Sequence, residues 1–318
     1  MLSVVVDLGG TNIRLAVCEP ITGELTQLET FLCTEFLSID DALIQYIRRL
    51  EHPVEHLCLG IASAFDGDYV TMLNLNWAFS IRALKEKLQL TSLYVINDYT
   101  AISLTLPFLL PSEKVQIGQG EVQKNGVTAV LGPGTGLGVA HIVKFSDQWV
   151  SLEGEGGHVS FTTNTQEQAD ILATLQLKFG HVSVERILSG QGLVNIYESL
   201  SMHAGLEVEF TLPKEISQAA LDGTCPIAGK SLDIFCQVLG SFAGNIALNL
   251  NCTGGVYIAG GIVPRFIPFL KQSEFRHFFE EKGRVKGILK KIPTFVITKD
   301  NPGLLGASVY LRQQLSKE

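Results

Sequence analysis

Short apolar runs alternate with amphipathic stretches along this chain. Eight runs rich in Val, Ile and Leu predict β-strands, at 4–7, 13–18, 57–61, 93–96, 128–131, 139–143, 256–259 and 294–298. Seven stretches with helical spacing of their apolar residues predict helices, at 40–50, 81–88, 99–106, 166–179, 191–201, 231–250 and 304–315. The alternation of the two kinds of element predicts an α/β protein.

The length of the chain predicts two domains. At 318 residues it exceeds the size at which one hydrophobic core usually stops growing. The segment 107–126, "PFLLPSEKVQIGQGEVQKNG", collects Pro, Gly, Gln and charged residues between two strand-rich halves, as a linker and its adjoining loop do. We therefore place the domain boundary near Leu109.

The charge of the chain argues against a polyanionic partner. The formal net charge is −8 and the isoelectric point is near 5.4, whereas binding to nucleic acid or an acidic membrane surface needs clustered Lys and Arg. The one basic run, "EEKGRVKGILKK" at 280–291, is interleaved with acidic and apolar residues and is interpreted as a solvated helix face. We expect no nucleic-acid partner.

The apolar segments and the cysteines predict a soluble, cytoplasmic protein. The longest apolar stretches, near 232–250 and 254–270, are broken by polar residues or proline well short of a membrane span. The N-terminus has no basic region before its apolar run, unlike a secretory signal. Six cysteines are scattered with no C-x-x-C pair, as in proteins of a reducing compartment.

Two glycine-rich turns share one design. "VVVDLGGTNIRLAVC" (4–18) and "AVLGPGTGLGVAHIV" (129–143) each read as a strand, a tight turn and a second strand. Neither contains G-x-G-x-x-G in register or a Walker A sequence, and neither is followed by a helix. Each is a plain hairpin or a turn that presents backbone N–H groups to a ligand.

Two further glycine segments accompany these turns. "GGVYIAGGIVPRF" (254–266) reads as a buried strand, two glycines and a helix start with Pro264 in its first turn. "DNPGLLGASVYL" (300–311) places Pro302 and Gly303 before the last helix and Gly306 where close backbone packing is needed.

Asn97 and Asp98 stand where the apolar strand of "YVINDYTAIS" ends. In open α/β sheets, ligands gather outside the carboxyl ends of the strands, so a substrate could be bound here. The alternative is that Asp98 caps a helix that begins at Tyr99, a common role for Asp.

A cluster of polar residues in glycine-rich loops predicts a sugar site. "SLEGEGGHVS" (151–160) brings Glu153, Glu155 and His158 together, and "HVSVERILSGQG" (181–192) carries Glu185. Sugar hydroxyls both donate and accept hydrogen bonds, which such side chains can satisfy. Alternatively, Glu153 is a solvated loop acid, Glu185 is a helix-surface acid, and His158 is a zinc ligand, although no cysteines follow it.

These motifs resemble the nucleotide-binding signatures of the sugar kinase, actin and heat-shock ATPase superfamily. Within it, "EGEGGHV", "VINDYTA", "GPGTGLGVA", "VERILSG" and "DNPGLLG", with "NWAFSI" at 76–81, resemble bacterial ATP-dependent glucokinases without the zinc motif of the ROK proteins. The sequence departs from that pattern at Pro133 and Ala64, where relatives usually carry a small residue and Pro.

The resemblance implies a two-domain, actin-like (ribonuclease H-like) ATPase fold, with mixed sheets flanked by helices and a cleft between the domains. It implies a small domain of 1–108 to which the C-terminal helix 299–318 returns, and a large domain of 109–298. It also implies a homodimer.

The resemblance further implies the site residues. Asp98 is the catalytic base, and the sugar hydroxyls are bound by Asn97, Glu155, His158 and Glu185. The residues implied in ATP binding are Asp7, Gly9, Gly10, Thr11, Asn12, Gly134, Thr135, Gly136, Gly260 and Gly261. Asp7 faces the Mg²⁺ of Mg-ATP through water, and no other metal is expected.

The implied reaction is transfer of the γ-phosphoryl group of ATP to the 6-hydroxyl of glucose. A kinase for mannose or fructose is the alternative within the enzyme class. A sugar-sensing repressor on the same fold would need a DNA-binding domain before the first glycine turn, where Asp7 leaves no room. A filament-forming or chaperone ATPase would not need Glu155, His158 and Glu185.

Overall fold

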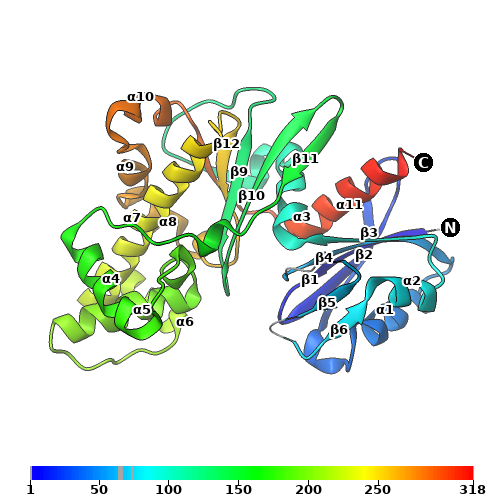
Figure 1. Ribbon diagram of the computed structural model, residues 1–318, viewed down its shortest axis with the longest axis horizontal. Coiled ribbons are helices and arrows are strands. Elements are labelled where there is room, and N and C mark those ends of the chain that lie inside the picture. The colour runs from blue at the N-terminus through cyan, green and yellow to red at the C-terminus, as the bar shows by residue number, and fades with distance from the viewer. Residues whose placement is uncertain (1, 64–66, 73–74, 318) are drawn as a thin grey trace. The chain divides into compact units, whose positions relative to one another are not determined.

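The computed structural model describes residues 2–63, 67–72 and 75–317, so Ala64 and the outermost residue at each end lie outside the described part. It contains two compact units (Figure 1). Unit 1 comprises 1–109, 145–153 and 299–318, and unit 2 comprises 110–144 and 154–298.

Unit 1 is built on a mixed sheet with the strand order β3-β2-β1-β4-β7. β1, β2 and β3 are antiparallel neighbours, whereas β1, β4 and β7 run parallel. The strands are β1 (Leu2–Leu8), β2 (Asn12–Cys18), β3 (Leu25–Leu32), β4 (Val54–Ile61) and β7 (Ser92–Asn97), with a separate hairpin of β5 (Tyr69–Thr71) and β6 (Ala78–Ser80) and the strand β11 (Gln148–Leu152).

Helices cover both faces of this sheet because β1 is apolar on both sides. Val4, Val6 and Leu8 pack in one core with α1 (Ile39–Ile47) and α2 (Ile81–Lys87). Val5 points the other way and packs in a second core with α3 (Asp98–Thr105) and α11 (Pro302–Leu315). Successive strand residues alternate between faces, so Asp7 shares the face of Val5.

Unit 2 holds β10, β9, β12, β13 and β8 of a six-stranded sheet whose order is β11-β10-β9-β12-β13-β8. β9, β12 and β13 are parallel, β10 is antiparallel to β9, and β8 is antiparallel to β13. The bounds are β8 (Lys114–Ile117), β9 (Thr128–Pro133), β10 (Leu137–Phe145), β12 (Gly255–Ile258) and β13 (Thr294–Ile297). The helices are α4 (Gln166–Phe179), α5 (Gly190–His203), α6 (Pro213–Leu221), α7 (Pro226–Asn249), α8 (Ile267–Gln272), α9 (Phe275–Glu280) and α10 (Lys286–Leu289).

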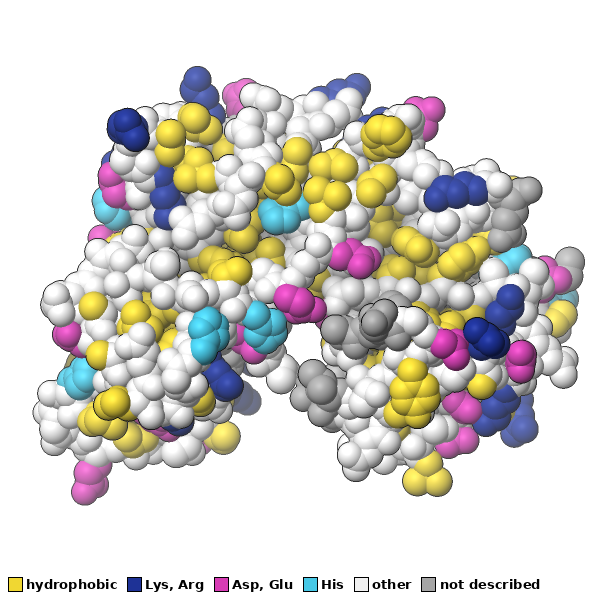
Figure 2. All heavy atoms as spheres, viewed as in Figure 1, with side chains coloured by type: hydrophobic (Ala, Val, Ile, Leu, Met, Phe, Trp, Pro, Cys, Tyr) yellow, Lys and Arg dark blue, Asp and Glu magenta, His cyan; other side chains and the backbone are white. Residues whose placement is uncertain are grey.

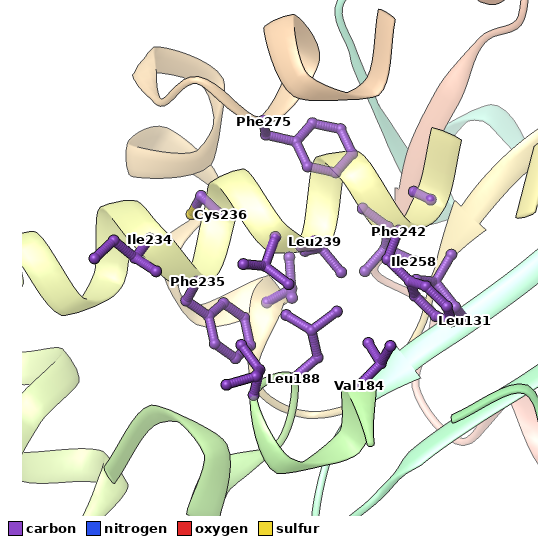
Figure 3. Close-up of a cluster of buried hydrophobic side chains, with 14 of the residues drawn as sticks. Leu131, Val184, Leu188, Ile234, Phe235, Cys236, Leu239, Phe242, Ile258 and Phe275 are labelled. Carbon is purple, nitrogen blue, oxygen red and sulfur yellow. The ribbon is translucent and has the colours of Figure 1, made fainter. Parts of the chain in front are cut away.

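Helix α7 forms the centre of the core of unit 2. Its Phe235, Leu239 and Phe242 pack with Leu131 of β9 and Ile258 of β12 (Figure 3). Of the described helices, α7 alone has the length and hydropathy needed to cross a membrane, and 83% of its apolar window is buried inside the protein. Such burial is typical of the core helix of a soluble protein.

All eight predicted strands and all seven predicted helices are present. The strands that the predictions missed include β3, whose residues are mostly exposed, and β8, which lies within the predicted linker. The interpretation of 280–291 as one helix face was wrong, because α9 ends at Glu280, a 3₁₀ turn spans Gly283–Val285, and α10 follows.

Basic and acidic side chains are interspersed on the surface of each unit on the face that Figure 2 shows.

Candidate functional site

The carboxyl ends of the parallel strands of unit 1 bring two predicted site segments to one edge of the sheet. Leu8 of β1 pairs with Ile61 of β4, which pairs with Asn97 of β7. Neighbouring strands are about 4.8 Å apart, so the ends of β1 and β7 are about 10 Å apart. Asp7 and Asp98 therefore lie at the same edge.

Helix α3 begins one residue earlier than predicted, and Asn97 is its cap. The side-chain oxygen of Asn97 accepts hydrogen bonds from the backbone N–H groups of Tyr99 (2.8 Å) and Thr100 (3.4 Å). Asp98 is the first helical residue, and its Oδ1 accepts from Tyr99 N at 2.9 Å. The alternative that Asp98 caps a helix from Tyr99 is therefore wrong; Asn97 occupies the cap position.

Asp7 is held between a cation and the first turn of the last helix. Its Oδ2 lies 3.3 Å from Nη1 of Arg14, and a Cβ added to Gly303 would lie 3.0 Å from its carboxyl carbon. Burial raises the pKa of Asp7, and the charge and hydrogen bond of Arg14 oppose that rise. Gly303 was predicted to precede the helix, but it lies within the first turn of α11 and leaves room for this carboxylate.

The first glycine turn is a tight hairpin between β1 and β2, as predicted. Gly9 N donates to Asn12 O (3.0 Å), and Cys33 N donates to Thr11 O (2.8 Å). Gly10 and Thr11 are exposed at its tip. The turn is therefore fixed by its own backbone while its tip stays accessible.

The second glycine turn, in unit 2, is held by hydrogen bonds from two directions. Gly134 N donates to Gly136 O (2.8 Å), and Gly190 N at the start of α5 donates to Gly134 O (2.9 Å). Oε2 of Glu185 accepts from Leu137 N (2.8 Å) and would lie 2.5 Å from a Cβ on Gly136. Thr135 is exposed between the two glycines.

The third glycine segment lies against the second turn. Gly260 has a φ of +85°, and a Cβ there would lie 2.4 Å from Pro133 O. Gly261 faces open space, with no heavy atom within 4 Å of an added Cβ. Pro264 occupies the first turn of the following 3₁₀ helix, as predicted.

Glu155 and His158 form an exposed pair in unit 2. Oε2 of Glu155 lies 3.9 Å from Nε2 of His158, and their side chains are 66% and 60% exposed. The glycines between them let the loop approach β10, because a Cβ on Gly157 would lie 2.0 Å from Leu137 O. Gly157 of this loop and Glu185 thus both lie against Leu137, at the end of the second glycine turn.

Two acidic residues have structural contacts that the sequence did not reveal. Glu153 was interpreted as a solvated loop acid, but its Oε1 accepts a hydrogen bond from Oγ1 of Thr100 in α3 (2.9 Å). Glu185 lies in a 3₁₀ turn, Val184–Arg186, and bonds the second glycine turn, so the helix-surface interpretation was wrong.

Sequence reasoning also missed residues that support the site. Arg14 pairs with Asp7 across the first hairpin, and Ser189 caps α5 by accepting from Gly192 N (3.0 Å). The alternation in β2 could have placed Arg14 on the face of Asp7, and the sequence "LSGQG" is a recognisable helix start. In the part of the chain that the structure describes, no three His, Cys, Asp or Glu side chains cluster as a metal site.

This arrangement can bind phosphate groups and a polar ligand. Turns with exposed tips, at Gly10, Thr11 and Thr135, and the positive end of the α5 dipole favour anions. Carboxylates at strand ends can accept a proton or face a cation.

The comparisons with known proteins agree with this chemistry. The glucokinase family matches residues 4–314. The chain is 49% identical over 316 residues to the glucokinase of Photorhabdus laumondii, a match that covers 99% of this chain and 98% of the relative.

Solved glucokinase structures have the same fold as this chain. The glucokinase from an Antarctic psychrotroph has 33% identity and a TM-score of 0.88, over 98% of this chain and 99% of that one. A ROK family glucokinase from Streptomyces griseus, solved with glucose and AMPPNP, has 20% identity and a TM-score of 0.66, over 98% and 100% of the two chains. The predicted actin-like ATPase fold is confirmed.

Proposed function

The chain belongs to the glucokinase family and phosphorylates glucose at its 6-hydroxyl with ATP, and we propose that Asp98 is the base in this reaction. Phosphoryl transfer requires mainly positioning, charge neutralisation and a group that accepts the proton of the attacking hydroxyl. The observation that carries the proposal is the position of Asp98 directly after β7, at the sheet edge that also holds Asp7.

Asp98 is suited to this role because Asn97 supplies the cap of α3. The amide oxygen of Asn97 accepts from the first N–H groups of the helix, which fixes the backbone that carries Asp98. The carboxylate then takes the proton from the 6-hydroxyl as the oxygen attacks the γ-phosphorus, and ADP leaves with the electron pair of the broken P–O bond.

The nucleotide is bound, in this proposal, by backbone groups of the three glycine segments. In unit 1 these residues are Gly9, Gly10, Thr11 and Asn12, and in unit 2 they are Gly134, Thr135, Gly136, Gly260 and Gly261. Backbone N–H groups at the exposed tips of such turns stabilise phosphate oxygens, and Gly260 has a backbone conformation that other residues rarely adopt.

Asp7 is the residue proposed to face Mg²⁺ of Mg-ATP. Mg²⁺ keeps several waters and takes one or two carboxylates, so a mostly buried Asp that contacts an Arg suits a water-mediated contact. When bound, the ion neutralises charge on the phosphates. Arg14 and the first turn of α11 keep the carboxylate in place.

Sugar recognition is assigned to Asn97 in unit 1 and to Glu155, His158 and Glu185 in unit 2. The high exposure of Glu155 and His158 leaves their polar atoms able to bind hydroxyl groups. Glu185 uses Oε2 for the second glycine turn, so Oε1 is the atom we assign to the sugar.

The substrate experiment separates glucose from the alternatives. Initial rates with glucose, mannose and fructose at fixed Mg-ATP give kcat/KM for each hexose. We expect the highest value for glucose. A higher value for mannose or fructose would assign the chain to that sugar, and no turnover with any hexose would favour a sensing protein.

We further propose a cytoplasmic homodimer. All six cysteines are free, and burial raises the pKa of Cys236 and Cys252 to about 12, which suits a reducing compartment. The dimer rests on the family resemblance, and light scattering of the purified protein tests it.

A further inference from the structure

A cavity of about 380 Å³ in unit 2 is unrelated to the glycine turns. Its lining residues are Gln123, Thr253, Arg284, Gly287, Ile288, Lys291 and Ile292. Ligand sites typically begin at about 300 Å³. A volume of this size is enough for a small organic molecule.

The cavity lies at the opposite end of the sheet from the nucleotide residues. Gln123 precedes β9, Thr253 precedes β12 and Ile292 precedes β13, and these three strands are parallel. Gly134 and Gly260 follow the carboxyl ends of β9 and β12. Strands of this length separate the two ends by about 15–20 Å.

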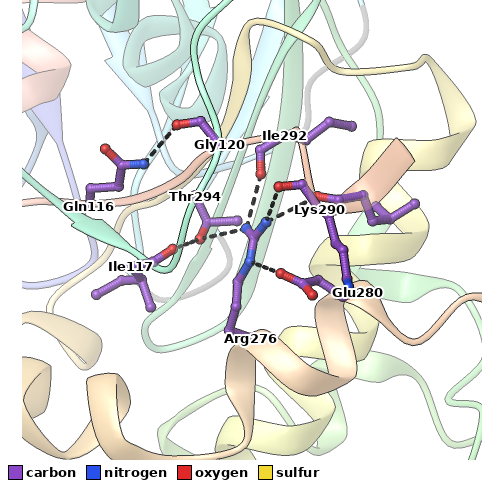
Figure 4. Close-up of polar contacts among 9 residues, drawn as sticks. Gln116, Ile117, Gly120, Arg276, Glu280, Lys290, Ile292 and Thr294 are labelled. Carbon is purple, nitrogen blue, oxygen red and sulfur yellow. Dashed lines mark hydrogen bonds and ion pairs between the residues drawn. The ribbon is translucent and has the colours of Figure 1, made fainter. Parts of the chain in front are cut away.

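The walls of the cavity are held by a half-buried network around Arg276. Its guanidinium donates to the carbonyl oxygens of Leu289 (3.0 Å) and Ile292 (3.0 Å) and pairs with Glu280 at 2.7 Å (Figure 4). This network fixes the end of α10 against the start of β13. The segment that carries Ile288, Lys291 and Ile292 is therefore anchored.

The opposite wall is fixed by close backbone packing. Gln123 N donates to Thr253 O (3.0 Å), and Glu121 N donates to Lys291 O (3.2 Å). A Cβ on Gly120, whose φ is +116°, would lie 2.6 Å from Pro293 N. The loop before β9 therefore lies directly on the segment before β13, and the cavity has a defined shape.

The polar groups of the cavity favour an anion. Within the described residues, neither Arg284 nor Lys291 has a carboxylate within ion-pair distance, whereas nearby Lys286 pairs with Glu281. The amide of Gln123 and the hydroxyl of Thr253 add neutral donors. Ile288 and Ile292 supply an apolar surface beside them.

We propose that this cavity binds a small organic phosphate. Arg284 and Lys291 bind the phosphate group, because guanidinium and ammonium groups form strong hydrogen bonds to phosphate oxygens. The carbon body of the ligand contacts the exposed side chain of Ile288. Inorganic phosphate alone would leave most of the volume unfilled. This site accounts for the basic run 280–291, which the glucokinase reaction does not use.

Calorimetric titration with glycerol 3-phosphate tests the proposal. The protein is first saturated with glucose and a nonhydrolysable ATP analogue, so that the glucokinase site is filled. We expect saturable binding that weakens at least about tenfold in Arg284→Gln/Lys291→Gln, because two charge-assisted contacts are lost. The matched control Lys214→Gln/Lys271→Gln removes two exposed lysines elsewhere in unit 2 and should bind like the wild type.

A second pair of variants tests the cavity itself. Gly287 lines the cavity and has no heavy atom within 4 Å of an added Cβ, so Gly287→Leu should fill space without a clash and abolish binding. Gly229→Leu adds the same side chain at another open helical position and should not affect it. Absence of saturable binding to the wild type, equal affinity in wild type and cavity variants, or equal affinity for glycerol or inorganic phosphate would overturn the proposal.

Discussion

Asn97 and Asp98 are adjacent but have different structural roles. Asn97 is the cap of α3, and Asp98 is the first residue of the helix. The sequence placed both at the end of a strand, but it assigned the cap to the wrong residue. Asn and Asp cap helices about equally well, so propensity could not separate them. The hydrogen bonds from Tyr99 N and Thr100 N to the side chain of Asn97 show that Asn97 is the cap.

The two residues should therefore respond differently to substitution. Asp98→Asn keeps the cap and removes the base, so we expect an unchanged melting temperature and a loss of turnover of about a hundredfold or more. Asn97→Ala removes the cap and should cost about 1 kcal/mol of stability. Thermal melts with saturated initial rates check both. Normal turnover in folded Asp98→Asn would show that Asp98 is not the catalytic base.

Asp7 gives a prediction about pH. Burial raises the pKa of Asp7, so its ionised form costs stability in the folded state. For an acid with a raised folded-state pKa, the stability contribution is full below the unfolded-state pKa and is lost as pH rises toward the folded-state value. The stability of Asp7→Asn relative to the wild type should therefore be higher at neutral pH than at acidic pH. Its turnover should be lower than that of the wild type.

Urea unfolding at several pH values measures this difference. If Asp7→Asn loses more stability at neutral pH than in acid, the carboxylate is stabilised by Arg14 more than burial destabilises it, and the stated direction is wrong. Initial rates at varied Mg²⁺ report separately on the proposed role of Asp7 with the ion.

At the scale of elements, glycines determine how close segments approach. Gly306 of α11 faces α3, and a Cβ there would lie 1.6 Å from Ala101 O. Gly306→Ala must push the two helices apart, and overpacking of this kind costs about 1–3 kcal/mol or more. Gly287→Ala is the control, because its Cβ meets open space. Denaturant melts should show a loss for Gly306→Ala alone; similar stabilities would refute the close packing.

Glu185 links a 3₁₀ turn to the second glycine turn. In Glu185→Gln the amide oxygen can still accept from Leu137 N, whereas Glu185→Ala leaves this N–H without its partner. We expect Glu185→Ala to raise KM for ATP severalfold and Glu185→Gln to leave it nearly unchanged, while both weaken glucose binding. Steady-state kinetics with each substrate varied would contradict this role if the two variants had the same KM for ATP.

The elements that the sequence predicted well are those with strong local patterns. β1, β4 and β9 each contain a short apolar run, and the glycine turns between paired strands are recognisable without a structure. β3 and β8 were missed because edge strands with exposed residues lack such a pattern. Contacts such as Leu137 N with Glu185 join residues far apart in the sequence, and no local signal predicts them.

At the scale of the whole molecule, each unit carries part of the proposed machinery. Unit 1 holds Asp7, Asn97 and Asp98, and unit 2 holds Glu185 and the second glycine turn. The family match spans residues 4–314, so the same order of motifs extends along nearly the whole chain. The central claim is that this chain transfers a phosphoryl group from ATP to glucose.

Phosphorus-31 NMR of the purified protein with glucose and Mg-ATP tests that claim most directly. We predict that the γ-phosphoryl signal of ATP is replaced by that of glucose 6-phosphate, one equivalent for each ADP formed, and that Asp98→Asn does this far more slowly. Release of inorganic phosphate without a sugar phosphate, or phosphorylation at another hydroxyl, would contradict the account.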